Sequence, residues 1–247
     1  AELAGSGIEL VKIPTGNAAA HIDWLARNVP AGQTVAVDGQ VLGLAAAKML
    51  RSALDAAGVK LRTDLDPINA IWPDRPGLPA QPVYEHLAPH ATLPRTDKLA
   101  LVRAAMKQHG ATQHFVSTVD DIAWITNLRG ADVEYNPVFL AHLLIDANAA
   151  TLFLAEGKAD GALRTKLAAQ GFNVAPYAEA PTALARLGAQ DLLLIDPKRV
   201  TLGLREAVPA HTRVVEAINP STLAKSRKGD AEAAFIREAM AQDGAAM

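Results

Sequence analysis

Six prolines fall within residues 73–94, and this crowding sets the strongest limit on how the chain can fold. Proline fixes φ and restricts the residue before it, so the stretch can form neither a helix nor a central strand. It also acts as a stiff spacer more than as a flexible one. We therefore predict a domain junction between Ile71 and Pro94, with a separately organised segment on either side.

The segment before the junction alternates short apolar runs with helical spacing. The expected strands are 8–13, 34–38 and 59–62, and the expected helices are 18–27 and 42–57. Gly58 is suited to end the second helix. This alternation of strands and helices is typical of an α/β unit with parallel strand pairing.

The segment after the junction predicts a larger α/β unit. The expected helices are 96–109, 122–127, 163–170, 182–187 and 200–208, and the expected strands are 114–118, 138–146, 151–154, 172–175, 191–196 and 212–216. Leu99, Val102 and Met106 are placed to form the buried face of the first of these helices. Residues 147–150 separate two apolar runs and predict a hairpin turn.

Residues 37–44 and 195–202 share a pattern, in which an apolar strand ends in aspartate and a short polar turn leads into a helix. An internal duplication accounts for the match, although two units of the same kind could also arise independently. Residues 96–154 have no counterpart before the junction, so under duplication we expect the chain to begin inside its first domain.

A final helix is expected from Asp230, whose carboxylate can cap it, toward Met247. Its apolar stripe consists of Ala231, Ala234, Phe235, Ala239 and Met240. An amphipathic helix buries such a stripe against a surface. That surface is either the body of the domain or a further domain.

Composition excludes several classes of function. The chain has 24 Lys and Arg against 26 Asp and Glu, a net charge of −2, which gives no field to attract nucleic acid or anionic lipid. No apolar run approaches the roughly 18 residues of a membrane span, and the N-terminus lacks a signal-peptide pattern. The absence of cysteine excludes disulfides, thiolate zinc sites and cysteine nucleophiles. We expect a cytoplasmic protein without nucleic-acid or membrane partners.

The chain lacks the common catalytic motifs, including the phosphate-binding loop, the hydrolase elbow and the zincin motif. His86 and His90 have helical spacing, but Pro89 lies between them, so we expect solvated linker residues and not metal ligands. The histidines at 109, 114 and 142 are expected to be structural. Asp121 is expected to cap the helix that starts at residue 122 and not to form a metal pair with Asp120.

The loop from Asn127 to Pro137 gathers polar side chains between two apolar elements. They are Asn127, Arg129, Asp132, Glu134, Tyr135 and Asn136. Polar side chains at the end of a strand are the usual material of a ligand cleft in α/β proteins. The alternative is a self-satisfied loop in which Arg129 pairs with Asp132 or Glu134, and the residues alone leave both open.

The same stretch resembles a known family. Residues 121–139, DIAWITNLRGADVEYNPVF, resemble the middle-domain signature of the long, three-domain Xaa-Pro aminopeptidases (aminopeptidase P). Residues 71–76, IWPDRP, resemble the family's junction between its first and middle domains, and residues 224–246 resemble the first helix of its catalytic domain. Together these matches extend over nearly the whole chain.

The resemblance implies an α/β fold of the creatinase/prolidase N-terminal type, with a three-layer mixed sheet, flanking helices and a partial duplication. Residues 1–81 then form the C-terminal part of the first domain with the proline-rich junction, and residues 82–220 form a complete middle domain. Residues 221–247 form a linker and the first helix of a pita-bread catalytic domain.

The resemblance also implies an activity for the parent protein. The family removes the N-terminal residue from peptides with proline second, and its catalytic domain holds two divalent ions, usually manganese. None of its metal ligands matches a position here, so we expect no catalytic, cofactor-binding or metal-binding residue in this segment, which alone is predicted to be inactive. Because the family's N-terminal domains lean over the active site, Asn127, Arg129 and Asp132 are expected to face the substrate cleft.

A second hypothesis is a self-contained α/β module that binds a peptide or small ligand by itself. Under either hypothesis, a truncated first domain and an unsupported final helix leave apolar faces uncovered. Uncovered apolar surface favours self-association, so a homo-oligomer is a further expectation.

Overall fold

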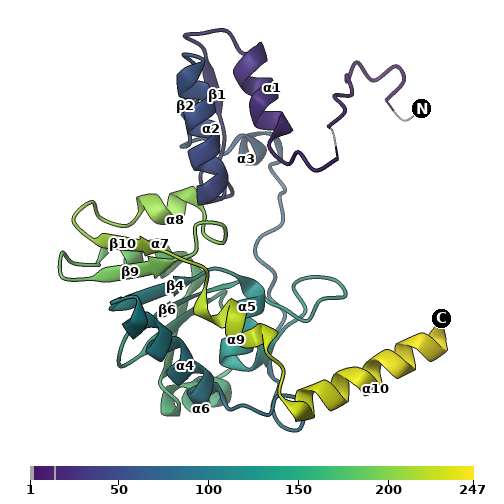
Figure 1. The fold of residues 1–247 in the computed structure, drawn as a ribbon, viewed down its shortest axis with the longest axis vertical. Coiled ribbons are helices and arrows are strands. Elements are labelled where there is room, and N and C mark those ends of the chain that lie inside the picture. The colour runs from purple at the N-terminus through teal and green to yellow at the C-terminus, as the bar shows by residue number, and fades with distance from the viewer. Residues whose placement is uncertain (1–2, 14) are drawn as a thin grey trace.

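The computed structural model describes residues 3–13 and 15–247 (Figure 1). Its N-terminal unit contains α1 (Ala20–Asn28), β1 (Thr34–Ala36), α2 (Leu44–Ala56) and β2 (Lys60–Arg62). β1 and β2 pair in parallel, as predicted. α1 and α2 supply Ile22, Leu50 and Leu54 to a small core that includes Val59. Gly58 follows α2 with φ 69°, a left-handed conformation that glycine adopts at little cost.

The predicted strand at residues 8–13 is wrong. These residues lie outside the helices and strands, and the side chains of Ile8 and Leu10 are 64% and 65% exposed. The sheet of this unit has two strands, β1 and β2. A strand forms where a neighbour accepts its backbone hydrogen bonds and covers its side chains, so an apolar alternation without such a neighbour does not form one.

A six-stranded mixed sheet, in the order β10-β9-β4-β6-β7-β8, is the centre of the larger unit. Its strands are β4 (Gln113–Val116), β6 (Ala141–Ile145), β7 (Ala150–Leu154), β8 (Phe172–Pro176), β9 (Leu192–Ile195) and β10 (Arg213–Glu216). β4, β9 and β10 are parallel, whereas β6 and β7 form the predicted hairpin. Oδ1 of Asp146 accepts the backbone N–H groups of Asn148 and Ala149, both at 2.7 Å, and closes that turn.

Helices cover both faces of this sheet and give the three expected layers. One face carries α4 (Arg95–Gln108), α5 (Val119–Thr126) and α6 (Gly161–Ala169), and the other carries α7 (Ala180–Ala185), which follows the 3-10 turn Tyr177–Glu179, and α8 (Leu202–Glu206). Side chains alternate along the strands, so Val116 packs with the first group and Phe115 with the second. The buried face predicted for residues 96–109 is confirmed, because Leu99, Val102 and Met106 are all buried in α4.

The two units meet through reciprocal backbone hydrogen bonds at the repeated sequence pattern. The N–H of Leu44 donates to Val200 O (2.9 Å), that of Leu202 to Leu42 O (2.7 Å), that of Ala45 to Pro197 O (2.9 Å) and that of Gly203 to Gly39 O (2.8 Å). Each bond made by one copy recurs at the equivalent positions of the other. Asp38 and Asp196 also close equivalent turns, each accepting the backbone N–H two residues later. This local two-fold arrangement supports the predicted duplication.

Several elements lie outside the two main sheets. They are α3 (Pro67–Ile71), β3 (Tyr84–Glu85), β5 (Leu128–Arg129), α9 (Pro220–Ser226) and α10 (Asp230–Ala246). β3 and β5 pair as a separate antiparallel ribbon, which is compatible with the prolines before β3 because no central strand is involved. α3 and α9 are too short for a periodic pattern to reveal them.

α10 is confirmed as a helix, and it extends away from the body of the molecule (Figure 1). Gly229 occupies the N-cap position, so the prediction that Asp230 caps this helix is wrong. Asp230 instead lies in the first turn, where its charge complements the helix dipole. Ile236 and Met240 are 45% and 62% exposed. No helix in the described part of the chain is long and apolar enough to cross a membrane.

Candidate functional site

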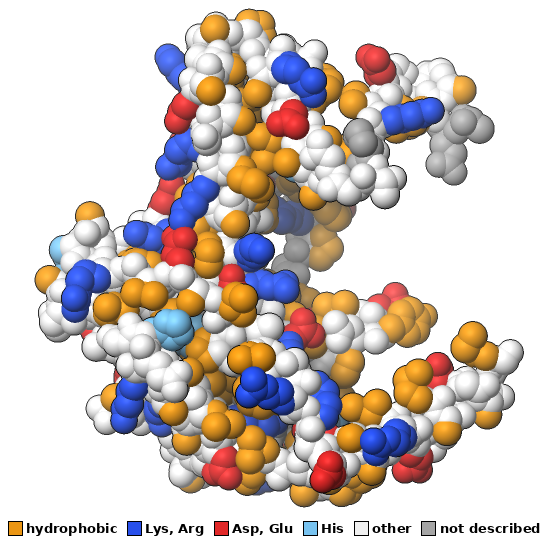
Figure 2. Space-filling model, in the orientation of Figure 1, with side chains coloured by type: hydrophobic (Ala, Val, Ile, Leu, Met, Phe, Trp, Pro, Cys, Tyr) orange, Lys and Arg blue, Asp and Glu red, His pale blue; other side chains and the backbone are white. Residues whose placement is uncertain are grey.

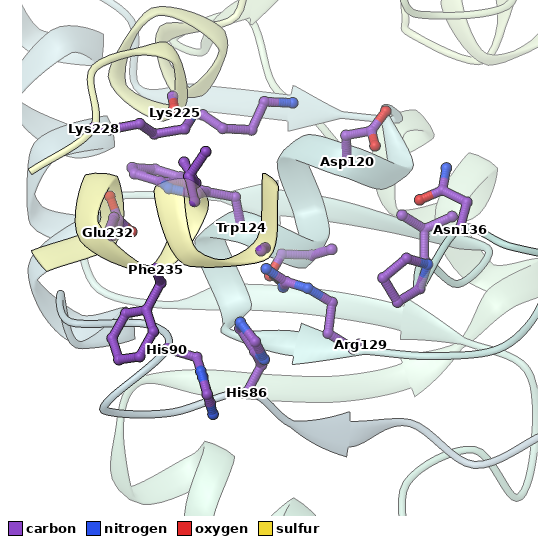
Figure 3. Close-up of a pocket in the computed structure, with 15 residues that line it drawn as sticks. His86, His90, Asp120, Trp124, Arg129, Asn136, Lys225, Lys228, Glu232 and Phe235 are labelled. Atoms are coloured by element: carbon purple, nitrogen blue, oxygen red, sulfur yellow. Dashed lines mark hydrogen bonds between the residues drawn. The ribbon is translucent and has the colours of Figure 1, made fainter. Parts of the chain in front are cut away.

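A cavity of about 540 Å³ lies between α5, the loop after β5, and α10 (Figure 3). Its walls hold charged, aromatic and apolar side chains from five parts of the chain. Those labelled in the figure are His86, His90, Asp120, Trp124, Arg129, Asn136, Lys225, Lys228, Glu232 and Phe235. The loop from Asn127 to Pro137, predicted from the sequence as a possible ligand cleft, therefore contributes to the cavity, together with α9 and α10.

Asn127 ends α5 in a left-handed conformation with φ 51° and ψ 35°, which asparagine adopts more readily than most residues. Its side chain is buried and uses both ends of its amide. Oδ1 accepts from Nζ of Lys98 at 2.6 Å, and Nδ2 donates to the carbonyl of Leu93 at 2.9 Å. Asn127 therefore reaches the cavity wall indirectly, through Lys98, which lies against Trp124.

Lys98 is a buried cation with a neutral hydrogen-bond partner. Its Nζ lies 4.6 Å from the centroid of the Trp124 ring, a distance typical of a cation–π contact. Burial lowers the pKa of Lys98 to about 8, while the carboxylate of Glu232 acts in the opposite direction. Since Trp124 and Glu232 both line the cavity, the charge of Lys98 contributes to its electrostatics.

Arg129, two residues after Asn127, lines the cavity directly. Its Nη1 donates to the carbonyls of Ala123 and Leu128, both at 2.8 Å, so one end of the guanidinium bridges the last turns of α5 and the start of β5. Burial lowers the pKa of Arg129, although arginine stays charged at physiological pH. The side chain extends from β5 toward α5 (Figure 3).

Asp132 forms an ion pair with Lys158, and both side chains are 0% exposed. Nζ of Lys158 lies 2.5 Å from Oδ1 of Asp132 and also donates to the carbonyl of Gln81 at 3.1 Å. Oδ2 of Asp132 accepts the N–H of Leu140 at 2.7 Å. The carboxylate therefore fastens the loop after β5 to Lys158. Lys158 in turn binds Gln81, in the segment before β3. The proposed pairing of Arg129 with Asp132 does not form, because Lys158 takes that carboxylate.

The loop between β5 and β6 folds back on itself as a short hairpin. The N–H of Asp132 donates to Val138 O and that of Asn136 donates to Val133 O, both at 3.2 Å. A Cβ at Gly130 would lie 2.7 Å from Cβ of Phe139, so only glycine fits at the base of the hairpin. Tyr135 is at the tip, 98% exposed, with φ 60°.

The prediction that Asp121 caps a helix starting at residue 122 is wrong. α5 begins at Val119 with Thr118 at the N-cap, so Asp121 lies inside the helix and does not cap it. Its buried Oδ2 accepts from Nδ2 of Asn219 at 3.2 Å and from Oγ1 of Thr222 at 3.0 Å. Nζ of Lys225 lies 3.1 Å from Oδ1. Asp121 therefore fastens α9 to α5, and thereby sets where α10 begins.

We predict that Asp121→Asn lowers the free energy of unfolding by about 2 kcal/mol, because the amide loses the ion pair with Lys225 and presents a donor to groups that already donate. The same change loosens α9, so trypsin cuts faster at Arg227 and Lys228. Urea denaturation and timed proteolysis measure the two effects. Asp120→Asn, at an exposed neighbour, is the matched control and changes stability by less than about 0.5 kcal/mol. Equal effects of the two changes would contradict the role given to Asp121.

His86 and His90 are stacked, with ring centroids 5.8 Å apart, and the ring of His90 lies 5.2 Å from that of Phe235. His90 is exposed, as predicted, while His86 is half-buried and burial lowers its pKa. Across residues 3–13 and 15–247, no three His, Asp or Glu side chains gather closely enough to hold a metal ion.

Two other histidines are buried in the body of the larger unit. Nδ1 of His114 lies 3.0 Å from the carbonyl of Leu194, and Nδ1 of His142 lies 3.0 Å from Oγ of Ser117. Burial lowers the pKa of each imidazole to about 4. Both are neutral at physiological pH, and these contacts agree with the structural role predicted for them.

The sequence is similar to known proteins along most of its length. The creatinase/prolidase N-terminal domain family matches residues 74–232. A probable Xaa-Pro aminopeptidase P of Sordaria macrospora is 28% identical over 239 residues, which cover 91% of this chain and 39% of that protein. The corresponding protein of Aspergillus niger is 30% identical and is covered to 38%. The chain thus spans well under half the length of these relatives.

Among solved structures, the X-prolyl aminopeptidase of Caenorhabditis elegans superimposes with a TM-score of 0.83 and 22% sequence identity. The superposition covers 93% of this chain and 39% of that protein, which is described as a cytosolic enzyme with a di-nuclear active site. At this identity the likeness establishes the α/β fold. Since the family match extends over more than half of the sequence, this chain belongs to the creatinase/prolidase N-terminal domain family.

Proposed function

We propose that this chain is the noncatalytic N-terminal and middle portion of a proline-specific metalloaminopeptidase. The observation that carries the proposal is the similarity of 91% of the chain to proteins named Xaa-Pro aminopeptidase P, of which it covers only part. In this assignment the parent enzyme removes the N-terminal residue from Xaa-Pro peptides in the cytoplasm. Two divalent ions, manganese in our proposal, act in its catalytic domain.

We propose a division of the chain into three parts. Residues 1–81 are the end of a first domain with its junction, residues 82–220 are the middle domain, and residues 221–247 lead into the catalytic domain. α10 then belongs to the catalytic side, and it forms one wall of the cavity that Arg129 lines. We propose that the middle domain roofs the active site at this cavity and limits substrate access there.

Of the three residues expected to face the substrate cleft, Arg129 is the one we propose to meet substrate. Nη1 is occupied by the end of α5, which holds the guanidinium in place at the cavity wall. Asn127 binds Lys98, which lies against the cavity wall. Asp132 holds the loop after β5 in place through Lys158. We assign these two residues a positioning role.

The first test compares the chain with the protein made from the complete reading frame of its gene. With Mn²⁺ and an Xaa-Pro peptide, the complete protein is expected to release the N-terminal residue, and these 247 residues alone are expected to release none. A peptide or small ligand bound tightly by the 247-residue chain itself would favour the stand-alone binding module instead.

The second test concerns Arg129 in the complete protein. We expect Arg129→Ala to lower kcat/KM by about tenfold, equivalent to about 1.4 kcal/mol of transition-state stabilisation. The free energy of unfolding should fall by less than this, because Ala123 lines the open cavity, where water can take the place of Nη1 at its carbonyl. Steady-state kinetics and urea denaturation give the two values, with Glu134→Ala, an exposed change in the same loop, as control. A loss of stability with unchanged kinetics would leave Arg129 with a structural role only.

A further inference from the structure

Tyr135, at the tip of the hairpin between β5 and β6, has two features that oppose folding. Its side chain is 98% exposed, so its ring gains nothing from burial. Its φ of 60° lies in the left-handed region, where a side chain with a Cβ is strained. Strain of this kind concentrates at functional sites. The stability of this chain therefore gives no reason for a tyrosine at this position.

The hairpin below Tyr135 is held firmly. Its two arms are joined by the Asp132 to Val138 and Asn136 to Val133 hydrogen bonds, both 3.2 Å. Its base is anchored by the buried carboxylate of Asp132 on Lys158. The tip is thus presented at a fixed place, which a contact residue requires.

The position of the tip relates it to the cavity. Asn136, Pro137 and Val138, which directly follow Tyr135, line the same cavity as Arg129 and Trp124. Figure 1 shows the hairpin projecting beside α5, on the side toward which α10 extends. Figure 2 shows the surface hollowed between this projection and α10, with hydrophobic side chains on both sides. Tyr135 therefore stands at the rim of the proposed substrate path.

We propose that Tyr135 is a specificity-determining contact for the part of a peptide substrate that follows its proline. The inference rests on the proposed function. An aminopeptidase takes the N-terminal end of the peptide into its reacting centre, so the residues after the proline are the ones that reach the rim. An exposed phenol ring offers a flat apolar face to peptide planes and side chains, and a hydroxyl to their polar groups.

The expected effect depends on substrate length. In the complete protein, Tyr135→Ala lowers kcat/KM for a pentapeptide beginning Ala-Pro by about three- to tenfold, the range of one aromatic contact. The Ala-Pro dipeptide has no residue to reach the rim, so its kcat/KM changes by less than about twofold. Tyr135→Phe retains the ring and most of the pentapeptide activity. Val133→Ala, another exposed apolar position of the hairpin, is the control and leaves both substrates unchanged.

Tyr135→Gly separates recognition from folding. Glycine relieves the positive φ, so the melting temperature of this variant stays equal or rises, while its pentapeptide kcat/KM falls as in Tyr135→Ala. A melting temperature that stays equal or rises while the pentapeptide kcat/KM falls would support a contact between Tyr135 and the substrate. Equal losses on dipeptide and pentapeptide, no loss on the pentapeptide, or a changed oligomeric state with unchanged length dependence would each overturn it. Failure of the complete protein to cleave any Xaa-Pro peptide would overturn the proposed function, and this inference with it.

Discussion

Replacing Asp132 with alanine is expected to lower the free energy of unfolding by about 3–5 kcal/mol, the largest effect of a single substitution that this structure predicts. Lys158 then lacks its carboxylate partner in a site where its side chain is 0% exposed, with the carbonyl of Gln81 as its remaining partner. The N–H of Leu140 also loses its acceptor. Urea denaturation of the 247-residue chain, followed by circular dichroism, measures the change.

Two variants keep this prediction specific to the ion pair. Glu134→Ala removes an exposed carboxylate two positions along the same loop and should alter stability by less than about 0.5 kcal/mol. The double variant Asp132→Leu, Lys158→Met replaces both charges with apolar groups and should recover most of the loss, since a buried pair often contributes little net stability. If Asp132→Ala were no more harmful than Glu134→Ala, the buried pair would not be what holds the loop.

Acidification is expected to destabilise the chain between pH 6.5 and 4 through His114 and His142. Burial lowers the folded-state pKa of each to about 4, from an ordinary value of 6.5. As the pH falls, the two imidazoles therefore take up protons in the unfolded chain before they do so in the folded chain, and this favours unfolding. The stability contribution is complete above pH 6.5 and is lost as pH falls toward 4, to the extent of about 3 kcal/mol for each imidazole.

The histidine origin of this loss can be isolated by substitution. In the double variant His114→Asn, His142→Asn, the amide can replace the hydrogen bond at Nδ1 but does not titrate. We expect it to be less stable than the parent at pH 7, because smaller side chains leave space in the core, but to lose less stability between pH 7 and 4.5. His21→Gln, at an exposed histidine of the N-terminal unit, should keep the parental pH dependence. A double variant with that same pH dependence would assign the acid lability to other groups.

The features that the sequence predicted depend on neighbours along the chain. The buried stripe of α4 repeats at helical spacing, and the turn at Asp146 is closed by backbone groups two and three residues away. Local spacing is enough to identify such elements. The strand predicted at 8–13 failed because a strand also needs a partner in space, which spacing along the chain does not reveal.

The site was predictable to a smaller extent for the same reason. The density of polar residues in 127–137 pointed to the wall that Arg129 lines. Lys158, the partner of Asp132, lies beyond the β6–β7 hairpin. Asn219 and Thr222, the partners of Asp121, follow β10 at the end of the larger unit. Spacing along the chain does not reveal partners so far away in the sequence. Pairing of Arg129 with Asp132 or Glu134 was one of two alternatives that the sequence left open, whereas its Nη1 binds backbone carbonyls that any sequence would supply.

The reciprocal bonds between the repeated segments have a mechanical consequence. Contacts exchanged in this way are those of an isologous dimer, here enclosed within one polypeptide. Swinging the N-terminal unit away from the six-stranded sheet would break Leu44 to Val200 and Leu202 to Leu42 together, and would uncover Leu44 and Ala47. These reciprocal hydrogen bonds therefore couple the two units mechanically. A force applied to one unit is transmitted to the other.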